Sequence, residues 1–183
     1  MMLSSSQAQI NNSVFVSEQG FIALQEQLNK TQARYLEVCE QRRIAHELSG
    51  DGWHDNPEFN RQQQMEAFLN GEVKRLLQAL EKAKIFTVQE HARPLDKVWL
   101  GSVVEVEITH CLSGNIHHEM WEIVGHGESN AELKKLAYDV PLARAMLTLQ
   151  VDDCSDEFVL RGEEVFISVV KLYASRQQAG LGE

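Results

Sequence analysis

The sequence predicts an α+β protein in which an N-terminal antiparallel α-helical coiled-coil hairpin precedes a small antiparallel β-sheet domain with one short helix. Two apolar seams with heptad spacing, separated by a glycine-rich turn, predict the hairpin. Period-two alternation between turn dipeptides predicts the sheet in the second half of the chain. The length of 183 residues and the hydrophobic content of 43% suit one large domain or two small ones.

The first helix is predicted from an uninterrupted seam that follows a helix start at Ser17 and Gly20. Its positions alternate three and four residues apart: Phe21, Leu24, Leu28, Thr31, Tyr35, Val38, Arg42 and Ala45. A similar seam predicts the second helix: Met65, Leu69, Val73, Leu76, Leu80 and Ala83. Two helices joined by so short a turn must run antiparallel, and about 30 residues per arm give a hairpin about 45 Å long.

The turn between the helices is acidic and reads Gly50-Asp51-Gly52-Trp53-His54-Asp55-Asn56-Pro57-Glu58-Phe59. Its glycines end the first helix, and Asn56-Pro57 begins the second, because proline is favoured at the first helical position. The carboxylates of Asp51, Asp55 and Glu58 are therefore predicted at an exposed tip. Acidic residues are also ordinary turn formers, so the turn alone does not establish a site.

The second half is divided by its turn signals into short strands. The predicted strands are residues 104–108, 119–124, 136–140, 158–160 and 165–172, and the short helix is 141–147. The predicted organisation is a flexible tail at 1–17, the coiled coil with its acidic tip at 18–90, a linker at 91–98, the sheet domain at 99–175 and a disordered tail at 176–183.

Composition limits the classes of function. The net charge of -10 argues against a general nucleic-acid coating role, which relies on a basic surface. Three cysteines without CxxC spacing indicate reduced thiols and a cytoplasmic location. The chain contains no apolar run near the roughly 20 residues that span a membrane, and residues 1–17 do not resemble a secretion signal. The sequence also carries no P-loop, nucleophile elbow or dinucleotide fingerprint, so neither a membrane nor a small-molecule substrate is expected.

Residue types that bind transition metals gather around the predicted hairpin turn at 114–115: His110, Cys111, His117 and His118. Sequence neighbours on a strand point to opposite faces, so His110 and Cys111 diverge, as do His117 and His118. This alternation argues against a shared metal site. Three aromatic residues are predicted to fill the sheet core: Trp99, Trp121 and Phe166.

Four segments carry a family resemblance. Ser17-Glu18-Gln19-Gly20-Phe21 opens the first helix, and the tip combines Gly50-Asp51 with Asp55-Asn56-Pro57-Glu58-Phe59. Ile123-Val124-Gly125 precedes Glu128, and Pro141-Leu142-Ala143-Arg144-Ala145 follows. In this order, over residues 17–174, they resemble the GreA/GreB transcript cleavage factors of bacterial RNA polymerase, whose tip reads Gly-Asp-x-x-Glu-Asn-x-Glu-Tyr.

The resemblance implies an N-terminal coiled coil that enters the polymerase secondary channel and an FKBP-like C-terminal domain that docks on the rim. It implies that Asp51 and Asp55 help to hold a catalytic Mg²⁺ ion shared with the polymerase, without a tightly bound cofactor of the chain's own. Mg²⁺ prefers hard oxygen ligands and often takes only one or two carboxylates. The chain is thus expected to assist the polymerase's own RNA cleavage and to be no enzyme by itself.

Further contacts with the polymerase and the RNA 3′ end are predicted from position. They are Trp53, His54, Glu58, Arg42, Arg43 and Arg61 on the hairpin, and Pro141 and Arg144 on the sheet domain. Family members often carry arginine where this chain has Glu47, and Arg43 is spaced to pair with it.

The leading hypothesis is a transcription elongation factor that stimulates 3′ transcript cleavage in backtracked complexes. The alternative is a Gre-like regulator that blocks the channel without promoting cleavage. The interval between Asp51 and Asp55 is one residue longer than in the family, and this extra residue and Trp53 favour the blocking version. A third hypothesis is a coiled-coil binding module for another partner.

Overall fold

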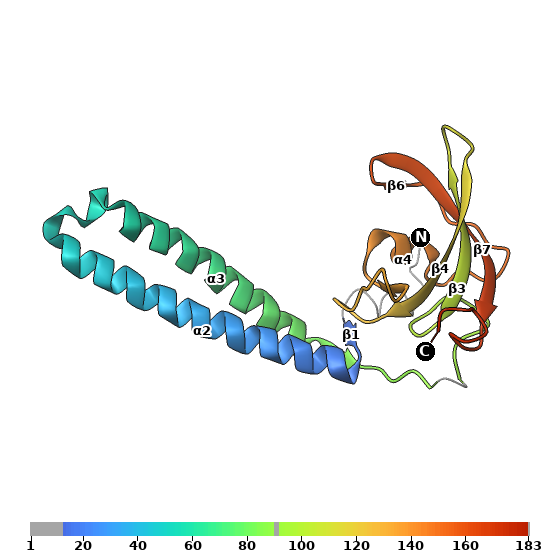
Figure 1. Ribbon diagram of the computed structural model, residues 1–183, viewed down its shortest axis with the longest axis horizontal. Coiled ribbons are helices and arrows are strands. Elements are labelled where there is room, and N and C mark those ends of the chain that lie inside the picture. The colour runs from blue at the N-terminus through green and yellow to red at the C-terminus, as the bar shows by residue number, and fades with distance from the viewer. Residues whose placement is uncertain (1–12, 90–91, 183) are drawn as a thin grey trace. The chain divides into compact units, whose positions relative to one another are not determined.

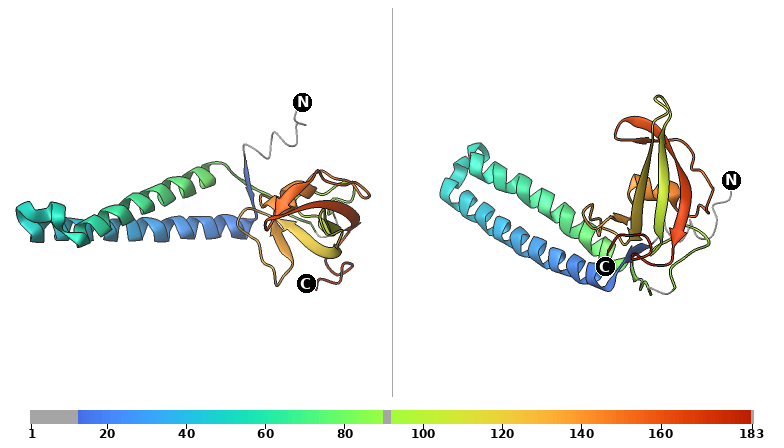
Figure 2. Two further views of the ribbon diagram at one scale, coloured as in Figure 1. Left: turned by 90° about the horizontal axis from the view of Figure 1, so that it is seen from above. Right: turned by 45° about the vertical axis from the view of Figure 1, so that its right-hand side comes forward.

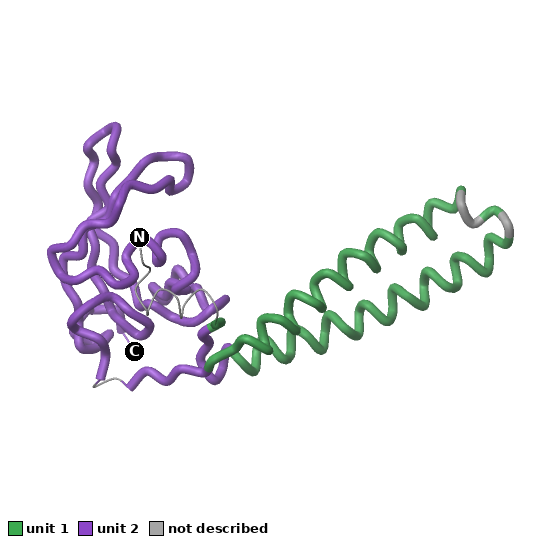
Figure 3. Tube along the Cα trace, turned by 180° about the vertical axis from the view of Figure 1, so that it is seen from behind, with its two compact units in different colours: residues 1–14, 21–84 green, residues 15–20, 85–183 purple. Residues whose placement is uncertain are grey.

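The computed structural model describes residues 13–89 and 92–182. The chain divides into two compact units, a helical unit of residues 1–14 and 21–84 and a sheet unit of residues 15–20 and 85–183 (Figure 3). Within the described residues, no helix is both long and apolar enough to cross a membrane.

The helical unit is the predicted antiparallel hairpin (Figure 1). Helix α2 (Glu18–Ser49) leads into the short 3-10 helix η1 (Gly50–Asp55), and helix α3 (Pro57–Glu81) returns. The 32 and 25 residues of the two helices correspond to about 48 and 38 Å. The predicted first seam is confirmed at the buried residues Leu24, Leu28, Val38 and Ala45.

The second seam runs through different residues from those predicted near the tip. Met65 was placed in it but is 36% exposed, whereas Phe59 and Gln62 are buried at 3% and 5%. Counting back from Leu69 in steps of three and four gives Glu66, Gln62 and Phe59. The prediction was wrong at Met65 because two polar residues occupy the inward positions.

Two short strands lie at the ends of the hairpin segment. Strand β1 (Val14–Val16) pairs with β2 (Ala83–Ile85) in a two-stranded sheet. The predicted flexible tail therefore ends in an ordered strand, in which Val16 is fully buried. Three residues are too few to produce a recognisable alternation in the sequence.

The sheet unit holds a five-stranded sheet in the order β5-β4-β3-β7-β6. Its strands are β3 (Val103–His110), β4 (Ile116–Val124), β5 (Lys135–Ala137), β6 (Phe158–Leu160) and β7 (Glu163–Tyr173). All neighbours are antiparallel except β4 and β5, which are parallel. The sheet is curved, and helix α4 (Pro141–Met146) lies on its inner side against β6 and β7 (Figures 1 and 2). The predicted fold class is confirmed.

Aliphatic side chains form the core between the sheet and α4. The fully buried members on the strands include Val104, Val106, Ile108, Val165, Ile167 and Val169, and Met146 joins them from α4. The aromatic residues predicted for this core, Trp99, Trp121 and Phe166, are only partly buried. The prediction was wrong for all three. Phe166 alternates with the fully buried Val165 and Ile167 and therefore lies on the opposite face of β7.

Arginines from the predicted linker and the predicted disordered tail are anchored on the sheet. Arg93 and Arg176 are 8% and 7% exposed, and both bind the carboxylate of Glu122 on β4. Arg176 also donates to the backbone carbonyls of Leu133 and Leu181. The ordered sheet unit therefore extends beyond residues 99–175 on both sides.

Candidate functional site

The hairpin tip is the six-residue helix η1, which joins the ends of α2 and α3. Gly50 has a φ of +53°, a left-handed conformation that ends α2 and that glycine adopts without strain. A side chain added at Gly50 or Gly52 would meet no described atom within 4 Å. The backbone of the tip is therefore open at these two glycines.

The predicted tip carboxylates belong to this one short turn. Asp51 and Asp55 are both within η1, and Asp55 is exposed. Glu58 lies in the first turn of α3, where a negative charge is favourable to the helix dipole. The side chains of Asp51, Trp53 and His54 lie outside the described part of the structure.

Asn56 closes the base of the turn. It is the N-cap of α3, and its Oδ1 accepts hydrogen bonds from the backbone N–H groups of Glu58 at 2.9 Å and Phe59 at 3.4 Å. Its Nδ2 donates to the carbonyl oxygen of Ala45 at 3.3 Å and to the hydroxyl of Ser49. One side chain thus bonds to the last turn of α2 and the first turn of α3.

Arg42, one of the predicted partner contacts, faces the other helix of the hairpin. It forms an ion pair with Glu66, which occupies an inward position of α3. Its guanidinium also lies over the ring of Phe59, with Cζ 5.9 Å from the ring centroid. Arg42 therefore contributes to the packing of the hairpin near the tip.

The other two predicted arginines also bind carboxylates of the hairpin. Arg43 donates to Glu40 at 2.7 Å and pairs with Glu47, and these carboxylates raise the pKa of its guanidinium. Arg61 pairs with Glu58 at 3.0 Å. A basic surface that would attract RNA is therefore largely compensated by acidic neighbours in this chain.

The carboxylate of Glu58 is held by two donors. The amide of Gln62 and the guanidinium of Arg61 both donate to its Oε1. The hydrogen bond from Gln62, followed by that from Arg61, lowers the pKa of Glu58 below its usual 4.5. Glu58 is thus ionised at neutral pH and fixed in direction along α3.

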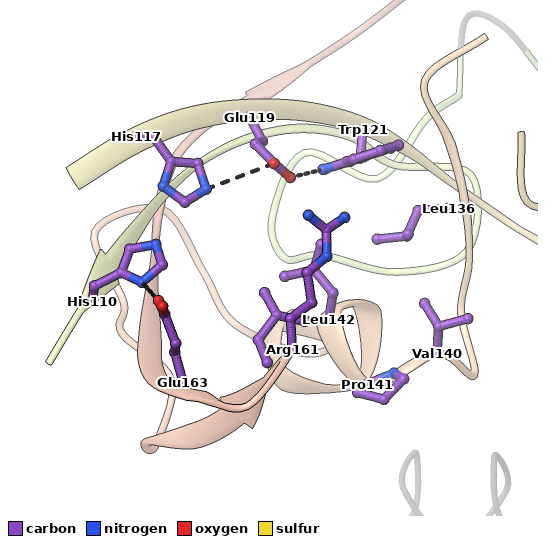
Figure 4. A pocket seen from close by; sticks show the side chains of 11 residues that line it. His110, His117, Glu119, Trp121, Leu136, Val140, Pro141, Leu142, Arg161 and Glu163 are labelled. Atoms are coloured by element: carbon purple, nitrogen blue, oxygen red, sulfur yellow. Dashed lines mark hydrogen bonds and ion pairs between the residues drawn. The ribbon is translucent and has the colours of Figure 1, made fainter. Parts of the chain in front are cut away.

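A second candidate site is a cleft of about 520 Å³ in the sheet unit (Figure 4). Its apolar wall consists of Leu136, Val140, Pro141, Leu142 and Leu160. The predicted contact Pro141 lies in this wall, whereas Arg144 is an exposed residue of α4 outside the lining. Pro141 and Arg144 are both exposed residues of α4, three positions apart, and their contact with the polymerase stays a prediction.

The polar rim of the cleft is built from histidine–carboxylate pairs. His110 Nδ1 lies 2.6 Å from Glu163 Oε2, and His117 Nε2 lies 3.7 Å from Glu119 Oε1 (Figure 4). The two imidazole rings are 5.3 Å apart between centroids. Trp121 donates its indole N–H to the other oxygen of Glu119 at 2.8 Å.

The predicted alternation of the histidines is confirmed by their partners. His117 lines the cleft, whereas His118 lies 3.3 Å from Glu107 on the other face of the sheet. Among the described residues, no group of three or more histidine, cysteine, aspartate and glutamate side chains is arranged to hold a metal ion.

The start of α2 depends on a residue far away in the sequence. The hydroxyl of Ser17 accepts a hydrogen bond from the N–H of Gly20 at 2.9 Å, and Glu128 accepts one from the N–H of Ser17 at 2.7 Å. This resembles a capping box in which the carboxylate comes from the loop between β4 and β5 and not from the third helical residue. A Cβ at Gly20 would overlap Oε1 of Glu128, which explains the glycine.

Curated relatives identify the family. GreA of Bacillus licheniformis, a transcription elongation factor, is 30% identical over 161 residues, which cover 86% of this chain and 94% of the relative. The chain belongs to the GreA/GreB family. GreA of Legionella pneumophila (strain Corby) is 27% identical over 139 residues, or 74% of this chain and 81% of the relative. A scan against protein-family models gave no match.

Solved structures of Gre-type proteins also align with the chain. The GreA factor homolog Gfh1 of Thermus thermophilus is 23% identical with a TM-score of 0.40, covering 88% of this chain and 99% of Gfh1. The GreA/GreB elongation factor of Nitrosomonas europaea is 16% identical with a TM-score of 0.32, and the alignment covers 87% of this chain and 98% of that factor. The assignment to the Gre family rests on the sequence relatives.

Three structural features of this Gre-family chain were missed by sequence reasoning. Asn56 was read only as a helix start, Glu66 was not recognised as an inward residue, and Glu128 was not linked to Ser17. The heptad spacing counted from Leu69 would have revealed Glu66. Nothing in the local sequence could have revealed the contact between Glu128 and Ser17.

Proposed function

We propose that this Gre-family transcription factor enters the secondary channel of bacterial RNA polymerase and stimulates 3′ transcript cleavage in backtracked complexes. Its tip would meet the RNA 3′ end, and its sheet unit would dock on the polymerase rim. The observation that carries the proposal is the placement of Asp51 and Asp55 in one open turn between two long helices. The side chain of Asp55 is exposed and therefore available to a site outside the chain.

The donor chemistry of the turn fits a shared Mg²⁺ ion. Mg²⁺ takes hard oxygen ligands and keeps several waters, so one or two carboxylates from the factor suffice. When bound between factor and polymerase, it supplies activation of a water for attack on phosphorus. The chain's own part is to bring Asp51 and Asp55 to that place, and the polymerase cleaves the RNA.

A second candidate function is channel blocking without cleavage. It is favoured by the ion pairs of Arg43 with Glu40 and Glu47 and of Arg61 with Glu58, which leave few free cations to hold an RNA 3′ end. It is also favoured by the longer interval between the two aspartates. Mg²⁺ geometry tolerates displacements of only about a few tenths of an ångström.

One assay separates the candidates. Purified protein is added to backtracked elongation complexes, and shortening of the RNA 3′ end and nucleotide addition are both measured. We expect shortening with the wild type, loss of shortening with Asp51→Asn and Asp55→Asn, and unchanged competition for the channel. Asp156→Asn, an exposed position of the sheet unit, is the matched control.

The other outcomes are equally informative. Cleavage by Asp51→Asn at the wild-type rate would show that the tip carboxylates play no part. Inhibited nucleotide addition without shortening would select the channel blocker. If the protein neither shortens RNA nor competes at the channel, its hairpin serves another partner.

A further inference from the structure

The turn that carries Asp51 and Asp55 is held at both of its ends by described hydrogen bonds. A Cβ added at Gly50 or Gly52 would meet no described atom within 4 Å. Six residues joining two helix ends sample many conformations unless the ends are fixed. The geometry of the tip therefore depends on what joins Ser49 to Asn56.

Asn56 provides this connection through both ends of its amide. The oxygen caps α3 at the N–H groups of Glu58 and Phe59, and the nitrogen donates to the carbonyl oxygen of Ala45 and the hydroxyl of Ser49. Ser49 itself donates to the Ala45 carbonyl at 2.7 Å. These bonds close a ring of hydrogen bonds at the base of η1.

Side chains of α2 and α3 also contact each other on the side of these hydrogen bonds away from the tip. Phe59 of α3 is 3% exposed, and the guanidinium of Arg42 from α2 lies over its aromatic ring. The same guanidinium forms an ion pair with Glu66 of α3. His46 contacts the same ring, with centroids 5.8 Å apart. The two helices are thus joined through side chains up to Asn56, directly below the turn.

We propose that Asn56 is a positioning residue, which sets the separation of Asp51 and Asp55 by tying the last turn of α2 to the first turn of α3. It does not touch the metal or the RNA. This inference rests on the proposed function of the tip, because it concerns the placement of the same carboxylates. A misplacement of about 1 Å can cost a factor of about a hundred in rate, so such a tie matters for an ion with strict geometry.

Two substitutions distinguish the hydrogen bonds from Asn56 to α2 from its role as the N-cap of α3. Asn56→Asp and Asn56→Ser both retain a good N-cap acceptor. Asn56→Asp has no amide donors, and Asn56→Ser is too short to reach Ala45. Ser49→Ala removes one of the two acceptors of the Asn56 amide nitrogen, so we expect a smaller effect on the turn. Gly71→Ala, in the exposed middle of α3, is the matched control for changes in helix stability.

The first readout is independent of the polymerase. The ¹H–¹⁵N heteronuclear NOE of the amides of residues 50–55 is measured in the full chain. We expect it to fall in Asn56→Asp and Asn56→Ser, while the amides of residues 60–80 and the far-UV circular dichroism keep their wild-type values. Unchanged NOE values at residues 50–55 would overturn the inference, whatever the factor does to RNA.

The second readout is the Mg²⁺ dependence of cleavage on backtracked complexes. We expect the Mg²⁺ concentration for half-maximal cleavage to rise about tenfold in both variants, with channel competition unchanged within about twofold. A mere loss of folding would weaken competition and leave the Mg²⁺ dependence as it is. A wild-type Mg²⁺ dependence in Asn56→Asp would refute the positioning role, whereas absence of cleavage by the wild type itself would refute the proposed function instead.

Discussion

Arg176 Nη1 donates to Glu122 Oε2 at 2.7 Å, and both side chains are less than a tenth exposed. The other oxygen of Glu122 accepts from Arg93 Nη1 at 2.9 Å. One carboxylate on β4 thus holds two segments that lie 29 and 54 residues away in the chain. Because the three groups are buried, each loses hydration that its ion-pair partners and, for the arginines, backbone carbonyls replace.

Removal of Glu122 is expected to destabilise the sheet unit more than removal of Arg176. Glu122→Gln leaves two buried guanidinium groups without a counter-ion, and we expect a loss of about 3–5 kcal/mol in unfolding free energy. Arg176→Met leaves the neutral pair of Arg93 and Glu122, and we expect a loss of about 1–3 kcal/mol. Urea unfolding, followed by tryptophan fluorescence in a Trp53→Phe background, measures both. A larger loss for Arg176→Met would contradict the assignment of Glu122 as the shared partner.

Gly20→Ala is expected to weaken the start of α2. The new Cβ would overlap the Glu128 carboxylate that accepts from Ser17, so the capping box must open or the chain must shift. We expect a loss of about 1–3 kcal/mol in thermal or urea unfolding, as for other overpacked sites. Gly71→Ala is the matched control and is expected to gain about 1 kcal/mol, because its new methyl meets no described atom within 4 Å. Equal behaviour of the two variants would show that Glu128 moves away freely.

The Arg42–Glu66 pair is expected to couple the two helices near the tip. Its side chains are 37% and 23% exposed, so solvent screens the pair only in part. A double-mutant cycle with Arg42→Gln and Glu66→Gln should give a coupling free energy of about 1 kcal/mol. Guanidinium chloride would mask the effect by screening, so urea at low salt is the denaturant of choice. A coupling free energy indistinguishable from zero would show that the Arg42–Glu66 pair does not contribute to the stability of the hairpin.

Glu58 is expected to titrate below its ordinary pKa of 4.5. The group is depressed because Gln62 and Arg61 donate to its ionised form. Its contribution to stability is therefore present above the unfolded pKa and is lost as the pH falls through the lower folded pKa. Carboxyl ¹³C NMR should show the depressed value in the wild type and a return toward 4.5 in Gln62→Leu. Gln63→Leu, an exposed neighbour, should leave the titration of Glu58 as it was.

Much of the fold followed from spacing alone. The first seam is correct because Leu24, Leu28, Val38 and Ala45 are apolar at inward positions. The second seam was wrong at Met65 because the polar residues Gln62 and Glu66 face inward. Glu66 pairs there with Arg42, and Gln62 donates a hydrogen bond to Glu58. Periodicity identifies a buried position only when its side chain is apolar.

The candidate sites were predictable to different extents. The glycines and Asn56-Pro57 predicted a turn within residues 50–59, and the structure has η1 at Gly50–Asp55. The cleft was not predictable, because His110 and Glu163 meet only through the pairing of β3 with β7. The sequence showed the alternation of each strand but not the register between them.

The sequence by itself determined the local elements: a helical hairpin with an acidic turn, a set of short strands and membership of the Gre family. Only the tertiary structure decided which charges are paired between segments that lie far apart in the chain. Arg42, Arg43 and Arg61 looked like a surface for RNA, and all three bind carboxylates of their own hairpin. The pairs of Arg43 and of Arg61 each lie within one helix, at a spacing that the sequence shows. Arg42 meets Glu66, and Arg176 meets Glu122, only because the fold brings distant segments together.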